Sequence, residues 1–143
     1  ARLSLVGSNP TAEVLALASG RVEVTGFVDD AERQRGYAQA RVAVVPLRYG
    51  AGVKSKVVEA LQQGLPLVTT PVGAQGLPGV EATCAVADDE AALAGHMLEL
   101  LADDAAWRKR SRLGVAYARA HFSRDTLRTQ LASALGIAAE RAS

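Results

Sequence analysis

A short stretch of the chain combines glycines with cations. Residues 50–56 read Gly-Ala-Gly-Val-Lys-Ser-Lys and follow an apolar run at residues 42–46. Glycine lets the backbone approach a ligand closely, and the free amides at the start of a helix attract anions. Lys54 and Lys56 add two positive charges at the same place. We therefore expect this stretch to bind a diphosphate.

Glu59 lies one helical turn beyond Ser55. Helical side chains lean toward the N-terminus of their helix, so we expect this carboxylate to point back toward the glycines. A carboxylate repels phosphates, and its useful partner would be a pair of hydroxyls such as those of a ribose. The residues alone leave a second interpretation open, in which Glu59 compensates Lys56 or caps free amides.

Two other phosphate-binding motifs are excluded by the residues present. A Walker loop requires glycine directly before its Lys-Ser pair and again five positions earlier, where this chain has Val53 and Arg48. A dinucleotide-binding fingerprint requires three spaced glycines after the first strand, and only Gly7 stands there.

Short apolar runs alternate with helical patterns along most of the chain. We expect strands at residues 3–6, 22–25, 42–46, 67–70 and 84–87. Helices are predicted from Pro10 with Val14, Leu15 and Leu17 as an apolar face, from residue 29 or 30 to 40, from 55 to 63, and through Leu93, Met97, Leu98 and Leu101. Alternation of this kind predicts an α/β class with a Rossmann-like parallel sheet.

The loops that follow two of these strands both contain glycines. One loop holds the glycines at residues 50–52, and the other, residues 71–76, holds Gly73 and Gly76. Open parallel sheets bind ligands beyond the carboxyl ends of their strands, so we expect both loops to line one cleft. Turn chemistry alone would also explain the second pair of glycines.

Two extra helices, predicted around Trp107–Tyr117 and Leu127–Leu135, carry an excess of positive charge. Residues 1–106 hold 8 basic and 13 acidic side chains, whereas residues 107–143 hold 8 basic and 2 acidic ones. A solvated helix face, a second domain and an anionic membrane surface are all compatible with this asymmetry. We expect the helices to pack toward a second domain, with membrane attraction as a secondary effect.

The composition is that of one globular domain, residues 1–143. Hydrophobic residues make up 49% of the chain, and aromatic residues only 4%, which leaves little for stacking a nucleic-acid strand. Cys84 is a lone cysteine, and no Cys/His group has the spacing of zinc ligands. Neither a signal peptide nor an apolar run of the length a membrane span needs is present, so we expect a cytoplasmic protein.

Three segments together resemble a known family. The sequence GAGVKSKVVEALQQGLPLVTTPVGAQGL at residues 50–77 resembles the C-terminal domain of GT-B-fold, family 4 (group 1) glycosyltransferases. VEVTGFVDD at residues 22–30 is similar to the strand and turn near the nucleotide base in that family, and YARAHFS at residues 117–123 is similar to the segment before its last helix.

The resemblance implies roles for particular residues. Glu59 matches the glutamate that binds the ribose hydroxyls of the donor, and Lys54 accompanies it at the reaction site. The residues that fall where the family meets phosphate or sugar are Gly50, Ala51, Gly52, Val53, Lys54 and Ser55. Those that match turns near the base are Gly7, Ser8, Phe27 and Val28.

By this resemblance the chain is the donor-binding half of a retaining, metal-independent glycosyltransferase. Its donor would be a nucleoside-diphosphate sugar such as a UDP- or GDP-sugar, with no further cofactor. An N-terminal acceptor-binding domain would lie outside this chain, and the acceptor could be lipid-linked. Ala51 stands where many members have a first glutamate, which indicates the subset with a glycine-rich loop there. The alternative is a non-catalytic nucleotide-binding or interaction domain.

Overall fold

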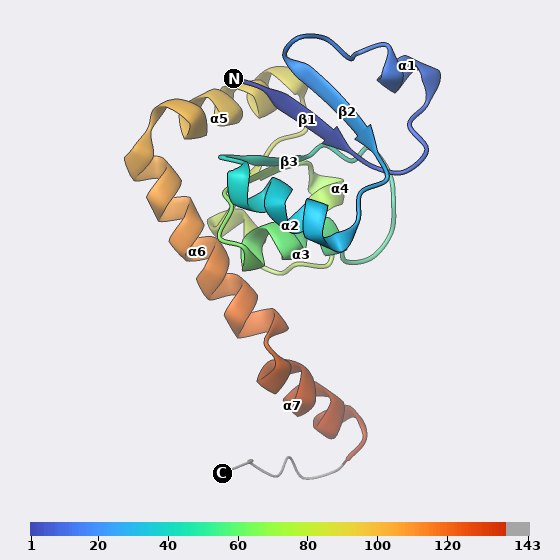
Figure 1. Ribbon diagram of the computed structural model, residues 1–143. Helices are drawn as coiled ribbons and strands as arrows, with labels where there is room; N and C mark the ends of the chain where they lie inside the picture. The colour runs from blue at the N-terminus through green and yellow to red at the C-terminus, as the bar shows by residue number, and fades with distance from the viewer. Residues whose placement is uncertain (137–143) are drawn as a thin grey trace. The chain divides into compact units, whose positions relative to one another are not determined.

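A computed structural model describes residues 1–136, which form two compact units (Figure 1). Unit 1 is Ala1–Gln39 and unit 2 begins at Ala40. Within residues 1–136, no helix combines the length and the apolar character needed to cross a membrane.

Unit 1 is a β/α/β/α segment with two parallel strands. Its elements are β1 (Leu3–Val6), α1 (Ala12–Leu15), β2 (Val22–Gly26) and α2 (Asp30–Gln39). Leu3 pairs with Val22, and the register shifts by one residue between Leu5 and Val6. Both strands predicted in this part of the chain are confirmed. Their β-branched residues favour a pleated, half-buried surface.

The start of α2 follows from two side chains that cap it reciprocally. The Glu32 amide donates to Asp29 Oδ1 at 2.7 Å, and the Asp29 amide donates to Glu32 Oε2 at 3.0 Å. This is the arrangement of a capping box, with the acid at the cap position replacing Ser or Thr. The predicted helix start at residue 29 or 30 is confirmed.

The prediction for α1 is wrong in its start and its extent. The helix begins after Thr11, whose side chain accepts a hydrogen bond from the Val14 amide at 3.4 Å, and it has only four residues. Threonine caps a helix well, which moves the start past Pro10. Leu15 and Leu17, predicted on its apolar face, are 51% and 57% exposed.

Unit 2 contains the remaining strands and the long helices. Its strands are β3 (Ala43–Val45), β4 (Leu67–Thr69) and β5 (Ala85–Val86). Its helices are α3 (Ser55–Gln62), α4 (Pro71–Ala74), a 3₁₀ turn η1 (Val80–Ala82), α5 (Glu90–Ala102), α6 (Asp104–Phe122) and α7 (Arg124–Ala134). The strands are parallel with β4 in the middle, so that Ala43 pairs with Leu67 and Val68 with Ala85.

The core of unit 2 joins the sheet to α5. Val68, Ala85, Leu93 and Leu100 are buried together, and Met97 packs against them. On α6, a β-carbon added to Gly114 would lie 3.1 Å from Leu61 Cδ2, so the glycine lets α6 come close to α3. The predicted strands are present but short, because the hydrogen-bonded ladders extend over only two or three residues.

Candidate functional site

The loop between β3 and α3, residues 46–54, is called the glycine loop here. Gly50 and Gly52 have φ angles of +131° and +72°, in a region where a side chain is strained. Lys54 folds back over them, since its Nζ donates to the Gly52 carbonyl oxygen at 2.5 Å. A β-carbon on Gly50 would lie 3.3 Å from Lys54 Cε. The loop is therefore compact, with the lysine amine held at its mouth.

Lys54 occupies the N-cap position of α3, and among the described residues its side chain makes no capping hydrogen bond. Side chains do cap the other α-helices of unit 2, at Thr70, Asp89, Asp103 and Ser123. The start of α3 thus combines backbone amides without a side-chain cap, a glycine loop and one lysine. This combination is suited to an anion such as a diphosphate.

Residues 71–76 meet the glycine loop at the carboxyl ends of β3 and β4. Gly76 has φ +79°, and a β-carbon there would lie 3.0 Å from Val53 Cγ2 and 3.4 Å from the Val53 amide nitrogen. The two loops are therefore in contact, as the strand order predicts. Glycine is therefore favoured at position 76 both by the positive φ angle of the turn and by the close approach of Val53.

Two threonines tie β4 and the residue after it to β3 and to the glycine loop. Thr69 Oγ1 donates to the Val45 carbonyl oxygen at 2.8 Å, and Thr70 Oγ1 donates to the Leu47 carbonyl oxygen at 2.6 Å. Thr70 Oγ1 also accepts from the Gly73 amide at 3.2 Å and so caps α4. A β-carbon on Gly73 would stand 2.0 Å from Thr69 Oγ1. Only glycine fits there.

Sequence reasoning missed α4 and this threonine pair. The signal was present in Thr70-Pro71, because Thr is a strong N-cap and Pro is favoured at the first helical position. The hydrogen bonds to Val45 and Leu47 had no sequence signal, since they join residues 23 and 24 positions apart.

The helix α3 presents different residues on its two sides. Ser55 and Lys56 are exposed in the first turn, and Glu59 is half-buried one turn beyond Ser55. Val57 and Ala60 are fully buried. At about 100° per residue, Ser55 and Glu59 share the side opposite these two. The ribose and phosphate roles of these residues stay predictions.

The residues predicted near a nucleotide base lie in unit 1, at the ends of β1 and β2. The Gly7 amide donates to the Gly26 carbonyl oxygen at 3.2 Å, so the turns that begin with Gly7-Ser8 and Phe27-Val28 are neighbours. Phe27 is 79% exposed, and Val28 is half-buried. An exposed aromatic ring beside a glycine turn offers a flat surface for a base.

The described histidines and the cysteine are engaged elsewhere. His96 Nδ1 lies 3.7 Å from Glu99 Oε2 on α5, and the ring of His121 stacks on Tyr117 with centroids 4.3 Å apart. Burial raises the pKa of the Cys84 thiol to about 11. Within residues 1–136, no three His, Cys, Asp or Glu side chains are grouped closely enough to hold a metal ion.

Comparisons with known proteins agree with this arrangement. A family model described as "Glycosyl transferases group 1" matches residues 1–103. Among solved structures, sucrose-phosphate synthase from Thermosynechococcus elongatus superposes with a TM-score of 0.76 at 28% sequence identity, over 94% of this chain. The present chain spans 38% of the length of that chain. No match is found among curated protein sequences.

Proposed function

Because the chain belongs to the group 1 glycosyltransferases, we propose that it binds the donor of such an enzyme, a nucleoside-diphosphate sugar. One observation carries the proposal: the glycine loop meets α3 at Lys54, and Gly76 presses on the loop from the next strand. Amides, a cation and a rigid loop converge at that point. A diphosphate is the part of the donor that needs this combination.

The chemistry proposed at this point is electrostatic. Negative charge develops on the departing diphosphate when the bond to the sugar breaks, and preorganised donors stabilise that charge. In the structure, Lys54 Nζ donates to the Gly52 carbonyl oxygen. When the donor binds, Nζ would donate to a phosphate oxygen instead. The α3 amides are fixed by the helix and need no rearrangement. Lys54 is thus the residue proposed to act on the leaving group.

The nucleoside is proposed to bind through the remaining predicted residues. Glu59 would accept hydrogen bonds from the ribose hydroxyls and orient the nucleotide without acting as a base. Gly7, Ser8, Phe27 and Val28 would lie at the base. Stacking on the Phe27 ring would accept any base, because every base has a flat face.

The transfer itself is proposed to require a second, acceptor-binding domain. Retention of configuration, independence of a metal ion and a cytoplasmic setting belong to the same proposal, and rest on the resemblance of residues 50–77 to the family. The chain alone would bind donor without transferring sugar.

The proposal is tested first by a thermal-shift screen of nucleoside diphosphates and their sugars, since a ligand stabilises only the state that binds it. The role of Glu59 is then tested by calorimetry with Glu59→Ala and with a 2′,3′-dideoxy nucleotide. Hydrogen bonds to a charged group are worth roughly 1.5–3 kcal/mol, so we expect each single change to weaken binding about tenfold to a hundredfold.

The combination of both changes decides the assignment. If Glu59 holds the ribose, the variant and the dideoxy ligand delete one shared contact, and together they lose little more than either alone. Fully additive losses would assign Glu59 a structural role. Glu81→Ala, which removes the same charge from an exposed position of unit 2, is the control and leaves affinity unchanged. Absence of binding by any nucleotide would refute the proposal.

A further inference from the structure

Tyr49 lies in the glycine loop and is the most exposed aromatic residue among residues 1–136. It is 86% exposed, and within that range its side chain makes no hydrogen bond and no ring contact. A single exposed ring needs no explanation by itself. The position of this ring does, because it stands in the loop where the diphosphate is proposed to bind.

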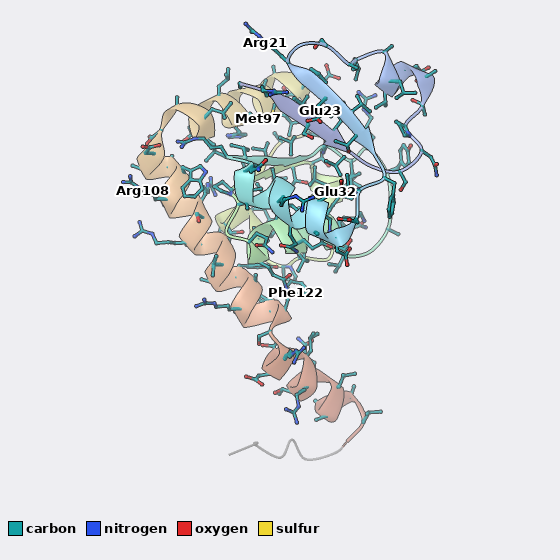
Figure 2. All side chains as sticks on the ribbon, viewed as in Figure 1. Arg21, Glu23, Glu32, Met97, Arg108 and Phe122 are labelled. Carbon is teal, nitrogen blue, oxygen red and sulfur yellow. The ribbon has the colours of Figure 1, made fainter. Side chains whose placement is uncertain are left out.

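The other aromatic side chains of unit 2 take part in its packing. Trp107 and Tyr117 each donate a hydrogen bond to a backbone carbonyl oxygen, at 2.7 and 3.1 Å respectively. Phe122 lies at the end of α6, with its ring centroid 6.5 Å from that of Tyr117 (Figure 2). Among the aromatic residues of unit 2, only Tyr49 leaves its ring open to a ligand.

The backbone is fastened on both sides of Tyr49. Before it, the Leu47 carbonyl oxygen accepts a hydrogen bond from the Thr70 hydroxyl at 2.6 Å. After it, Lys54 covers Gly50, where an added β-carbon would lie 3.3 Å from Lys54 Cε. A tyrosine side chain has only two rotatable bonds, so a ring on such a loop is ordered at low entropic cost when a ligand binds.

The ring stands close to the proposed diphosphate site. Tyr49 precedes Gly50, so the Cα atoms of these two residues are about 3.8 Å apart. A β-carbon on Gly50 would lie 3.6 Å from Lys54 Nζ. One donor molecule can therefore meet both the lysine amine and the tyrosine ring.

The connectivity of the donor indicates which of its groups reaches the ring. A nucleoside-diphosphate sugar carries the nucleoside on one phosphate and the sugar on the other. The ribose is proposed to meet Glu59 on α3, which leaves the sugar for the opposite side of the diphosphate. A pyranose has a face of C–H groups that packs on an aromatic ring, while the phenol hydroxyl of tyrosine stays in water.

We propose that the Tyr49 ring binds the sugar of the donor by stacking on its C–H face. This inference rests on the proposed donor binding and adds a residue that distinguishes the sugar nucleotide from the free nucleoside diphosphate. The contact depends on the face of the sugar and not on any one hydroxyl. It therefore favours pyranoses as a class.

The test is isothermal calorimetry with UDP, GDP and ADP, each compared with its glucose conjugate. Within a pair, the two ligands differ only in the sugar. We expect Tyr49→Ala to weaken binding of the glucose conjugate about fivefold to tenfold and to leave binding of the nucleoside diphosphate within twofold. Tyr49→Phe keeps the ring face and should bind both ligands like the native chain.

Phe27→Ala is the contrasting variant. It removes another exposed ring, 79% exposed, that is proposed to meet the base, so it should weaken both ligands of a pair by the same factor. In NMR spectra, the ring current should shift the sugar C–H protons of the bound conjugate upfield with the native chain and with Tyr49→Phe, but not with Tyr49→Ala. The denaturation midpoint should be the same in the native chain and both Tyr49 variants, because the side chain is exposed.

The possible results separate the sugar from other partners of the ring. Equal losses for both ligands in Tyr49→Ala would assign the ring to the nucleotide and overturn the proposal. Unchanged affinity for the glucose conjugate would overturn it too, and would leave the ring to an acceptor or a protein partner. A loss in Tyr49→Phe as large as in Tyr49→Ala would replace stacking by a hydrogen bond of the hydroxyl. Failure of every ligand to bind the native chain would refute donor binding itself, a result distinct from the other three.

Discussion

The contact between Gly76 and the glycine loop gives a sharp prediction for Gly76→Ala. Gly76 has φ +79°, and its added β-carbon would lie 3.0 Å from Val53 Cγ2 and 3.7 Å from the Gly52 carbonyl carbon. Alanine in the left-handed region costs about 1–2 kcal/mol, and the crowded contact adds about 1–3 kcal/mol. We expect a loss of about 2–5 kcal/mol in the free energy of unfolding.

The same substitution should also reach the proposed anion site. Val53 must move by a few tenths of an ångström to admit the methyl group, and its amide belongs to the loop next to Lys54. Misplacing one charge-assisted hydrogen bond to the diphosphate should weaken nucleoside-diphosphate binding about tenfold.

Gly79→Ala is the matched control. Gly79 has a nearly equal φ of +70°, but no heavy atom lies within 4 Å of its added β-carbon among the described residues. This variant therefore carries the backbone strain, about 1–2 kcal/mol, without the contact to the glycine loop.

Chemical denaturation measures the first effect and isothermal calorimetry with a nucleoside diphosphate measures the second. We expect Gly79→Ala to bind like the native chain and Gly76→Ala to bind more weakly, at a temperature where both are folded. Equal affinities in the two variants would refute the reasoning, because the loop contact would then have no influence on the anion site. Equal stabilities would show that the Val53 contact relaxes without cost.

Three further predictions concern Lys54, Cys84 and sugar transfer. Lys54→Ala should weaken nucleoside-diphosphate binding, and calorimetry at rising ionic strength should shrink the difference from the native chain, whereas Lys109→Ala should show no difference at any salt concentration. Burial raises the pKa of Cys84 from 9.0 to about 11, so its stabilising contribution is complete below pH 9 and is lost as the pH rises from 9 to 11; denaturation of Cys84→Ala should lack that part of the pH dependence. The chain should bind donor but show no sugar transfer to lipid or glycan acceptors, and turnover at the ~1–10³ s⁻¹ of typical enzymes would contradict the need for an acceptor domain.

Much of the fold could be predicted from sequence where one residue type decides the local conformation. Asp29 and Glu32 cap α2, and Asp89 caps α5 through the Ala92 amide at 2.8 Å. These contacts lie within three residues, so the sequence contains the whole interaction. The resemblance to the group 1 glycosyltransferases is confirmed by a family model that matches residues 1–103.

Prediction failed where neighbouring signals compete. Pro10 and Thr11 are both favoured at a helix start, and Thr11 prevails because its hydroxyl reaches the Val14 amide. Val14 and Leu17 have the i, i+3 spacing of an apolar face, but the helix ends at Leu15 and does not include Leu17. The division between residues 1–39 and the rest of the chain has no composition signal in the sequence either, and a single domain stays a prediction.

The residues that shape the candidate site differ in kind from those that would touch the ligand. Lys54 and Glu59 are among the residues proposed to touch the ligand, and their residue types and spacing identify them in the sequence. Thr69 and Gly73 are not proposed to touch the ligand. They lie so close together that a β-carbon on Gly73 would stand 2.0 Å from the Thr69 hydroxyl oxygen. That hydroxyl is tied to β3 through the Val45 carbonyl, so α4 is fixed against both strands.

The residues that shape the candidate site hold the backbone amides of the glycine loop in a fixed position. The glycines at 50 and 52 give the first loop freedom that would be costly to freeze on binding. Thr70, bonded to the Leu47 carbonyl, and Gly76, packed on Val53, hold that loop at both of its ends before any ligand arrives. The loop is thus held by a threonine and a glycine that would not touch the ligand, and this restraint is what would make the proposed anion site preorganised.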